Sequence, residues 1–397
     1  MSISKVQRWS LYIYFFSVNF DIWDPLNTNG AFSISKLTGL IYFFSILPEI
    51  NYFLSVKDLK VVLKPIWLFF ALLTIVSLLH INFFSSSFFD FSIFQNIVLL
   101  WILINHKRKE KNVLEEGMFS FALGSIVLSF CYFLGIGVEY DIAGRVSLFG
   151  GNSNSIGMQM CISIAIVILA VIQNQFELYR YRLILLACIP FMLKLLAESG
   201  SRVAFTSFVL MFSFGVILLK TKKTWYKIVA FVIGSIVFAL MIQYILNSSI
   251  LVNRLLQTVN EGDLAGRDEI WQELQPLILG NPLFGVGKTG YAEYSQKVFS
   301  GLKSPHNVII EILCYVGAFG FIAYFLFFIR VIKLIFKSYK KTKILLPPIL
   351  IFPIFGFILS GQILTSKIGW IIFSYSIASG LFLVQKPEIQ KSTLKYF

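Results

Sequence analysis

Residues 305–328 read PHNVIIEILCYVGAFGFIAYFLFF, a polar tripeptide followed by an apolar run with one carboxylate, Glu311. Roughly 20 apolar residues are enough to cross a bilayer as a helix, so the run from Val308 to Phe328 predicts a transmembrane helix. Pro305, His306 and Asn307 close the only long polar stretch of the chain. They therefore place one imidazole at a boundary between water and membrane.

The whole composition is that of a membrane protein. Hydrophobic residues make up 57% of the 397 residues, and the mean hydropathy is +0.78, whereas soluble domains contain about 45–50% apolar residues. We predict an all-α polytopic membrane protein with about 12 transmembrane helices, which form a single membrane domain over residues 1–397. The predicted spans are 9–23, 33–50, 61–81, 88–105, 114–136, 154–173, 182–197, 203–219, 226–246, 306–329, 344–362 and 365–384.

The distribution of Lys and Arg predicts the orientation. These residues gather in alternate connections between the spans, for example at 107–111, 220–223 and 330–343. Because positive residues accumulate on the cytoplasmic side of membrane proteins, we expect both termini in the cytoplasm. The loop 247–305, between spans 9 and 10, is then extracytoplasmic. The net charge of +14 is explained by this topology and does not predict nucleic-acid binding.

The extracytoplasmic loop is expected to carry an amphipathic helix that starts near Arg267, capped by Asp263 or Gly266. Its apolar positions 270, 274, 277 and 278 fall on one face, which is typical of a helix lying flat on a membrane. Pro276 and Gly280 are expected to end it. The glycine-rich segment 283–290 that follows is predicted to be a flexible connection, since a lone Gly-x-Gly is a weak phosphate-loop signal.

Four arginines are candidate anion ligands. Arg202 lies in a very short connection between two spans, so it must sit at the outer membrane surface, where an unpaired cation is costly. It could snorkel or pair with Glu198, but a guanidinium also matches phosphate oxygens with two parallel hydrogen bonds. Arg267 is the second candidate. For Arg145 and Arg254 an ordinary surface role is favoured.

His306 differs in position from His80 and His106, which lie at span ends. Ser304 is a plausible helix cap and Pro305 suits a first helical turn, so His306 and Asn307 are expected at a helix N-terminus that attracts anions. Asn307 and Glu311 would share one face of that helix, and an ionisable residue inside a membrane is a functional candidate. The four cysteines lie in apolar runs without a CxxC pair, so neither a disulfide nor a metal site is expected.

Four pieces of sequence carry a family resemblance. They are Gly144-Arg145 with the segment 151–157, GNSNSIG; then 199–202, SGSR; then 266–271, GRDEIW, with 281–287, NPLFGVG; and finally 305–307, PHN, with Gly317 and Gly320. In this order the chain resembles the O-antigen polymerase and ligase superfamily. The resemblance covers nearly half of the chain, from about Arg145 to Phe328.

The resemblance implies glycosyl transfer from a polyprenyl-pyrophosphate-linked glycan donor, without a metal ion or other cofactor, at the outer face of the bacterial cytoplasmic membrane. The acceptor would be a lipid-linked repeat unit or lipid A core. The implied catalytic residues are Arg202 and Arg267, which would bind pyrophosphate, and His306, as general base or acceptor-positioning residue. The implied substrate-binding residues are Arg145, Asn154, Arg254, Asn307 and Glu311. Membrane lipid is a further partner, and a flippase and a chain-length regulator are candidate partners.

Two features favour a polymerase that builds O-antigen or capsular/exopolysaccharide over a ligase that moves a finished glycan to lipid A core or protein. Val308 follows Asn307 where ligases often have Glu, and the Asn-rich segment around Asn152 and Asn154 is similar to that of polymerases. A transporter or flippase of lipid-linked saccharides is a further alternative. Transporters place ionisable groups near the bilayer midplane. Here the middle parts of the predicted spans are nearly free of charge, and Lys194 is the main exception.

Overall fold

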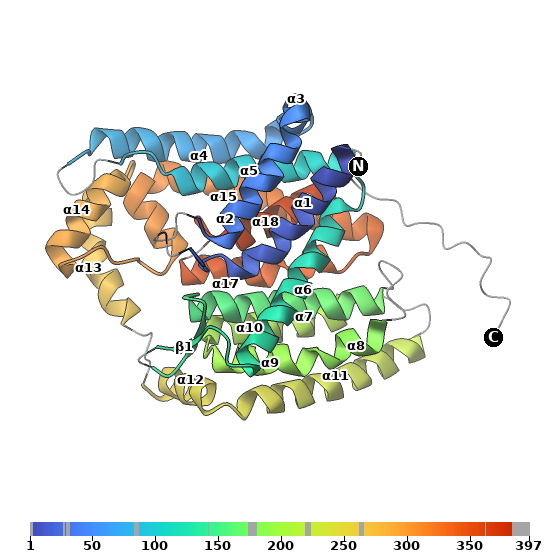
Figure 1. Ribbon diagram of the computed structural model, residues 1–397. Coiled ribbons are helices and arrows are strands. Elements are labelled where there is room, and N and C mark those ends of the chain that lie inside the picture. Colours follow the sequence, from blue (N-terminus) through green and yellow to red (C-terminus); the bar gives the residue numbers. More distant parts are fainter. Residues whose placement is uncertain are drawn as a thin grey trace.

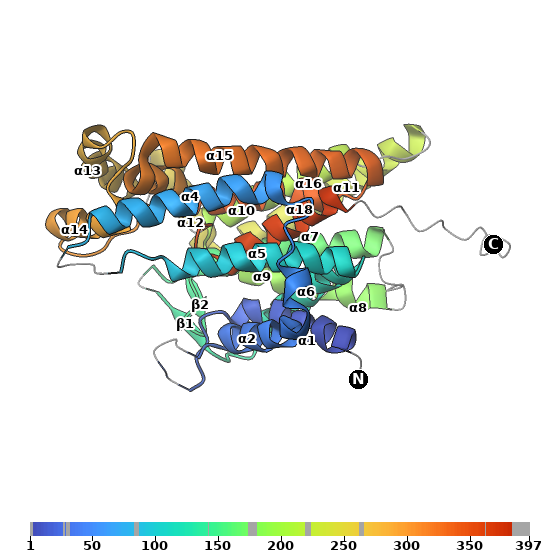
Figure 2. The same ribbon diagram turned by 90° about the horizontal axis from the view of Figure 1, so that it is seen from above.

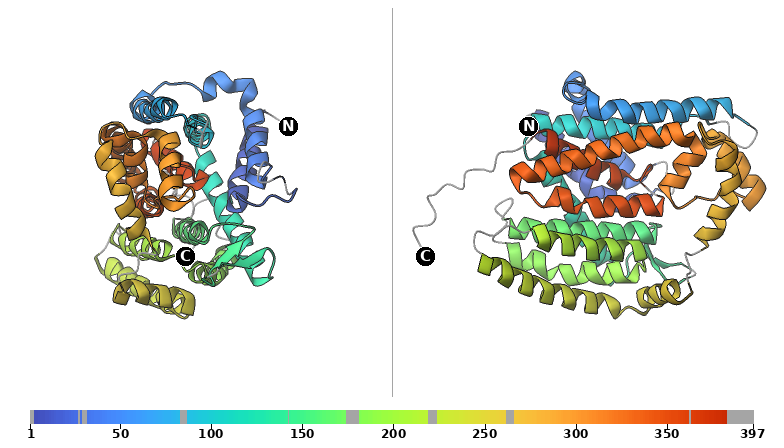
Figure 3. Two further views of the ribbon diagram at one scale, coloured as in Figure 1. Left: turned by 90° about the vertical axis from the view of Figure 1, so that its left-hand side faces the viewer. Right: turned by 180° about the vertical axis from the view of Figure 1, so that it is seen from behind.

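The computed structural model describes residues 3–26, 28, 32–82, 87–141, 143–173, 181–218, 224–261, 266–361 and 363–382. Over these residues the chain forms helices and one short hairpin of two strands (Figure 1). Most of the helices run side by side and are seen end on in the left view of Figure 3. The prediction of an all-α protein with membrane-spanning helices is therefore confirmed in this coarse form.

The elements follow one another along the chain as listed here. The first half contains α1 (Ile3–Ser17), η1 (Val18–Phe20), α2 (Ile34–Ile46), η2 (Leu47–Glu49), α3 (Ile50–Phe53), α4 (Lys60–Leu79), α5 (Phe91–Lys109), α6 (Val113–Phe133), β1 (Val138–Tyr140), β2 (Val146–Leu148), α7 (Ser153–Ile172), α8 (Arg182–Ala187) and α9 (Ile189–Glu198). The second half contains α10 (Arg202–Leu218), α11 (Thr224–Leu246), α12 (Ser249–Glu261), α13 (Arg267–Gly280), α14 (Gly287–Phe299), α15 (Val308–Thr342), α16 (Leu346–Ile349), α17 (Ile351–Ser360) and α18 (Lys367–Leu381).

Each of the twelve predicted spans contains helix. Among the described residues, four helices are long and apolar enough to cross a membrane alone, namely α4, α6, α7 and α15. A fifth span is formed if α11 and α12 are taken together, although their two parts, Gly234–Leu246 and Ser249–Asn260, meet at 93°. The number of twelve spans stays a prediction.

The two ends of the helix bundle differ. The loop helices α12, α13 and α14 gather with the hairpin at one end, and the start of α1 lies at the other (Figure 1). At the α1 end, Lys109 Nζ lies 2.8 Å from Gln7 Oε1, and Tyr339 donates a hydrogen bond of 2.8 Å to the carbonyl of Leu218. The basic ends of α5 and α15 thus lie on the side opposite the loop helices, as the predicted topology requires. Which end faces the cytoplasm is still predicted from Lys and Arg alone, and Arg180, Lys220, Lys222 and Lys223 fall outside the described residues.

The hairpin β1–β2 was not expected from the sequence. Its strands are antiparallel, with Glu139 opposite Ser147, and they lie beside α1 and α2 (Figure 2). The Asp141 carboxylate closes the turn by accepting hydrogen bonds of 2.9 Å from the backbone N–H groups of Ala143 and Arg145. An Asp side chain that bonds to the backbone just after it is a common way to build a turn. Here the turn fixes the backbone of Arg145.

The helix α15 is broken at Gly317, which has φ 58° and ψ −157°. This break leaves backbone groups on both sides without helical partners, and the segment 282–286 supplies them. The hydrogen bonds are Val286 N–H to Cys314 O at 2.9 Å, Ala318 N–H to Pro282 O at 2.9 Å, and Phe319 N–H to Leu283 O at 3.1 Å. Buried backbone groups must be paired, so the loop and the broken helix stabilise each other.

Two expectations about the loop are therefore wrong. The segment 283–290 is not a flexible connection, because it docks on the break in α15 and continues into α14. The helix α13 begins at Arg267 after Gly266, as predicted, but it runs through Pro276 and ends at Gly280. Its apolar face does not lie open to lipid, because Ile270, Leu274 and Leu277 are buried in the protein, where α13 packs on α15. Asp263, the other candidate cap, lies outside the described residues.

The helix α14 is also fixed at its start. Ser77, near the end of α4, accepts a hydrogen bond from the backbone N–H of Lys288 at 2.8 Å, and the Lys288 ammonium lies 2.6 Å from the buried carboxylate of Asp90. A Cβ atom at Gly287 would lie 2.5 Å from Ser77 Cα, so only glycine permits this approach. The loop that precedes His306 is thus held between α4 and α15.

We expect Gly317→Ala to lower the free energy of unfolding by about 2 kcal/mol or more. The added Cβ would meet the backbone carbon of Leu283 at 2.4 Å, and φ at this position is positive. The measurement is thermal unfolding of the purified protein in detergent. Gly301→Ala is the matched control, since a Cβ there meets nothing within 4 Å. Equal stability of the two variants would contradict the role given to the break.

Candidate functional site

His306 lies between the loop helices and the start of α15, in a backbone conformation that few residues adopt. Its φ is +50°, which is uncommon for a residue with a side chain and is tolerated by His, Asn and Asp better than by most. Its backbone N–H donates to Ser304 Oγ at 3.2 Å, and the indole N–H of Trp271 donates to the carbonyl of Pro305 at 2.8 Å. These contacts hold the imidazole at the surface of the loop end.

The predicted cap of α15 is corrected by the structure. Asn307, not Ser304, is the N-cap, because its Oδ1 accepts hydrogen bonds from the N–H groups of Ile309 at 2.9 Å and Ile310 at 3.4 Å. Pro305 precedes the helix and does not form its first turn. The side-chain oxygen of Asn307 is occupied by this cap, so the amide Nδ2 is the atom left to contact a substrate.

Two residues at the C-terminal end of α17 lie next to His306 and Arg267, and neither was expected from the sequence. A Cβ at Gly361 would lie 2.7 Å from His306 Cα, so glycine allows the two backbones to touch. The carbonyl of Leu359 accepts a hydrogen bond of 3.3 Å from the Arg267 guanidinium. This end of α17 therefore brings Arg267 and His306 together. In the sequence, Gly361 stands between Ser360 and Gln362 at the end of a predicted span and carries no such signal.

The charge of Arg267 acts on the imidazole. Partial burial and, second, the Arg267 cation lower the pKa of His306 below its ordinary value. Both causes disfavour the charged imidazolium. His306 is therefore held in its neutral form at neutral pH, the form that can accept a proton.

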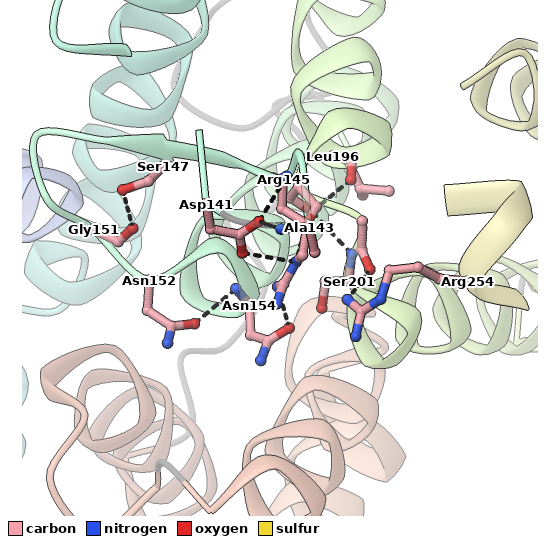
Figure 4. A network of polar contacts seen from close by, with 12 residues as sticks. Asp141, Ala143, Arg145, Ser147, Gly151, Asn152, Asn154, Leu196, Ser201 and Arg254 are labelled. Atoms are coloured by element: carbon pink, nitrogen blue, oxygen red, sulfur yellow. Dashed lines mark hydrogen bonds and ion pairs between the residues drawn. The ribbon is translucent and has the colours of Figure 1, made fainter. Parts of the chain in front are cut away.

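Arg145 and Arg254 meet at the connection between α9 and α10 (Figure 4). The Arg145 guanidinium donates to the carbonyl of Ser199 at 3.0 Å and to the Oδ1 of Asn154 at 2.8 Å. The Arg254 guanidinium donates to the carbonyl of Gly200 at 2.7 Å. Gly200 has φ +57°, and a Cβ there would lie 3.3 Å from Arg145 Cγ. From position alone an ordinary surface role was favoured for both arginines, whereas the family resemblance implied substrate binding. The structure ties both to the Ser-Gly-Ser-Arg segment.

Arg202 begins α10 and reaches α12. Its guanidinium donates to the carbonyl of Arg254 at 3.4 Å and also to the hydroxyl of Thr258. Burial lowers the pKa of Arg145, Asp141 opposes this, and the cations of Arg202 and Arg267 lower it further. Burial and Arg202 likewise lower the pKa of Arg267. The four arginines therefore share one neighbourhood of positive potential, which we call the arginine cluster: Arg145, Arg202, Arg254 and Arg267.

Glu311 stands apart from the arginine cluster. It lies on the first turn of α15, and its charged neighbours are Lys288 and Asp90. Its Oε2 is buried and has no hydrogen-bond partner among the described residues. Among the eight predicted site residues, His306 lies beside Arg267, Asn154 lies with the arginine cluster, and Asn307 caps α15. Glu311 instead lies near Lys288 of α14 and Asp90 at the start of α5.

The described residues contain no group of three or more His, Cys, Asp or Glu side chains that could hold a metal ion. The four cysteines are free. The charged groups that the arginine cluster itself offers are guanidinium groups. Such a site can bind an anion of the size of a phosphate or pyrophosphate group.

Comparison with known proteins supports the resemblance. The family model described as O-antigen ligase matches residues 187–325, a region that contains Arg202, Arg254, Arg267 and His306. No curated protein matches the chain. The hairpin and Asn154, which complete the site, lie before the matched region. The match confirms the resemblance seen in the sequence: over residues 187–325 the chain is similar to the O-antigen ligase family.

Proposed function

We propose that the chain is a glycosyltransferase that polymerises polyprenyl-pyrophosphate-linked repeat units into O-antigen or capsular/exopolysaccharide at the outer face of the cytoplasmic membrane. The observation that carries the proposal is the arginine cluster next to a neutral histidine. Guanidinium groups bind phosphate oxygens in pairs and keep their charge, and a neutral imidazole is suited to take a proton from a hydroxyl.

In the proposed reaction, a hydroxyl oxygen of the acceptor sugar attacks the anomeric carbon of the donor sugar. A new C–O bond forms while the bond from that carbon to the pyrophosphate oxygen breaks, and its electron pair leaves with the pyrophosphate. The hydroxyl proton passes to the ring nitrogen of His306. The arginine cluster stabilises the charge that grows on the leaving group, the kind of stabilisation that metal ions provide in other phosphate sites.

A ligase is the second candidate, and the description of the matching family as O-antigen ligase favours it. Both enzymes would use the same donor and differ in the acceptor. The glycan profile of a deletion strain separates them. Loss of the ladder with one repeat unit still attached indicates a polymerase, whereas loss of all surface glycan with carrier-linked polymer accumulating indicates a ligase.

We expect Arg202→Lys to reduce transfer about ten- to one-hundred-fold, which corresponds to one charge-assisted hydrogen bond. Lysine keeps the charge but cannot form two parallel bonds to a phosphate. The measurement is kcat/KM for lipid-linked oligosaccharide with purified protein. Arg8→Lys, at the opposite end of the bundle and paired with Glu110, is the control. Full activity of Arg202→Lys would remove Arg202 from the site.

We expect His306→Asn to reduce the rate of transfer about 10²–10⁴-fold. Donor binding and thermal stability should remain those of the wild type. Asparagine tolerates a positive φ better than most residues, so the variant tests the imidazole without straining the backbone. His80→Asn is the control, because His80 is at the end of α4 and its ring bonds to Val76 O. Wild-type turnover of His306→Asn would place the base elsewhere.

The pH profile of the wild type should show an acid limb below about pH 6.5, the ordinary pKa of histidine. A base acts in its neutral form, so activity is full above the pKa of His306 and falls as pH drops through it. Because burial and Arg267 lower this pKa, Arg267→Gln should move the acid limb of the residual activity to higher pH. An acid limb that does not move would show that Arg267 does not act on the titrating group.

A further inference from the structure

A cavity of about 220 Å³ opens beside the site. It lies between the end of η1, the turn after β2, the start of α7 and the residues just before α18. One water needs only about 10–15 Å³ by this kind of measure, so the cavity has room for a ring-sized ligand. Its lining combines aromatic rings with amide, hydroxyl and carboxylate groups.

The aromatic wall is formed by Trp23 and Phe149, whose rings stack at 4.6 Å between centroids. Phe149 has φ +52°, a strained conformation for a bulky residue. It is held by a hydrogen bond of 2.8 Å from its N–H to the carbonyl of Gly137, where a Cβ would meet the Phe149 ring at 2.5 Å. Strained positions persist where the surroundings enforce them, and they cluster at ligand sites.

The polar wall contains an amide oxygen without a hydrogen-bond partner among the described residues. Gln159, on α7, lines the cavity and is 4% exposed, and its Oε1 has no hydrogen-bond partner among the described residues. A buried polar atom left unpaired costs free energy and needs an explanation. Across the cavity, Asp21 is held by Lys367 Nζ at 2.6 Å. The carboxylate and the amide present hydrogen-bonding groups on two sides of the aromatic rings.

This chemistry selects a neutral sugar ring. A sugar has an apolar C–H face that can lie on an aromatic ring and hydroxyl groups that both donate and accept hydrogen bonds. A phosphate group would meet the Asp21 carboxylate, and none of the described residues that line the cavity is Arg or Lys. A lipid chain would leave Gln159 unpaired. Of these three ligands, a neutral saccharide satisfies the most groups.

The cavity adjoins the site from two directions. Asn152, in its lining, accepts a hydrogen bond of 2.8 Å from the N–H of Asn154, which bonds Arg145, and Asn152 and Asn154 lie next to one another in Figure 4. Thr365, also in its lining, follows closely on Gly361, which touches His306. A glycan that reacts at His306 could therefore place a neighbouring sugar here.

We propose that this cavity is a saccharide subsite that binds one neutral sugar ring of the glycan, stacked on Trp23 and Phe149 and hydrogen-bonded to Gln159. The inference rests on the proposed function, since it takes the glycan as substrate. The sugar can belong to the donor or to the acceptor chain. These two sources share the same chemistry, and the experiment separates them.

The main test is Gln159→Leu, which keeps the size of the side chain and removes the amide. Because Oε1 is unpaired, the variant should be at least as stable as the wild type in thermal unfolding. We expect it to bind the oligosaccharide released by mild acid from the host's own lipid-linked repeat unit about five- to tenfold more weakly. Binding is measured by calorimetry on full-length protein in detergent and does not require transfer.

Trp23→Leu provides an independent test should Gln159→Leu fold poorly. It should weaken binding to a similar degree, and Trp23→Phe, which keeps an aromatic ring, should restore most of the affinity. Trp9→Leu is the control, since Trp9 is 57% exposed on α1. In transfer assays, a raised KM for the acceptor alone assigns the sugar to the acceptor, and a raised KM for the donor alone assigns it to the donor.

If both Gln159→Leu and Trp23→Leu leave oligosaccharide binding and the KM values unchanged, the subsite proposal is overturned. The proposed function still stands in that case, provided that the wild type transfers glycan. The reverse outcome is also distinguishable. Oligosaccharide binding that these variants weaken, in a protein that transfers no glycan, would support the subsite and contradict the proposed transferase. The inactive His306→Asn protein should bind the oligosaccharide like the wild type.

Discussion

The loop end of the molecule depends on backbone hydrogen bonds between the segment 282–286 and the break in α15 at Gly317. Inside an apolar environment an unpaired backbone group costs several kcal/mol, so neither the break nor the loop is stable without the other. This pairing, with the anchoring of α14 on α4, sets the start of α15. The positions of Asn307 as its cap and of His306 just before it follow from that start.

The site brings together segments that are far apart in the chain, and each of these segments contributes one positively charged arginine. Arg145 comes from the hairpin turn, Arg202 from the start of α10, Arg254 from α12 and Arg267 from the start of α13. Close cations repel one another and lose hydration when partly buried. Such an arrangement is costly, and under the proposed function a multiply charged anion between the arginines would relieve it. Partial burial lowers the pKa of His306, and the Arg267 cation of the same cluster lowers it further.

Much of this could be predicted from the sequence, since hydrophobic runs located helices in all twelve predicted segments and short polar motifs located Arg202, Arg267 and His306. What could not be predicted depends on contacts between distant segments. The hairpin is too short to have a clear alternating pattern. Gly317 stands in an apolar run and Gly361 at the end of one, and nothing in the local sequence at either position indicates a close approach of two backbones. Asn307 was recognised as a site residue, yet its use as a cap depends on where α15 starts, and that is set by the loop.

The fixed charges of the arginine cluster also bear on how a catalytic cycle would end. Under the proposed function, cleavage leaves a free carrier pyrophosphate that carries one more negative charge than the donor. Four guanidinium groups held by carbonyls and side chains cannot withdraw easily, and they attract the more highly charged species more strongly. The product is then a stronger ligand than the substrate. Turnover would be governed by departure of the spent carrier into the bilayer, with product inhibition as its kinetic signature.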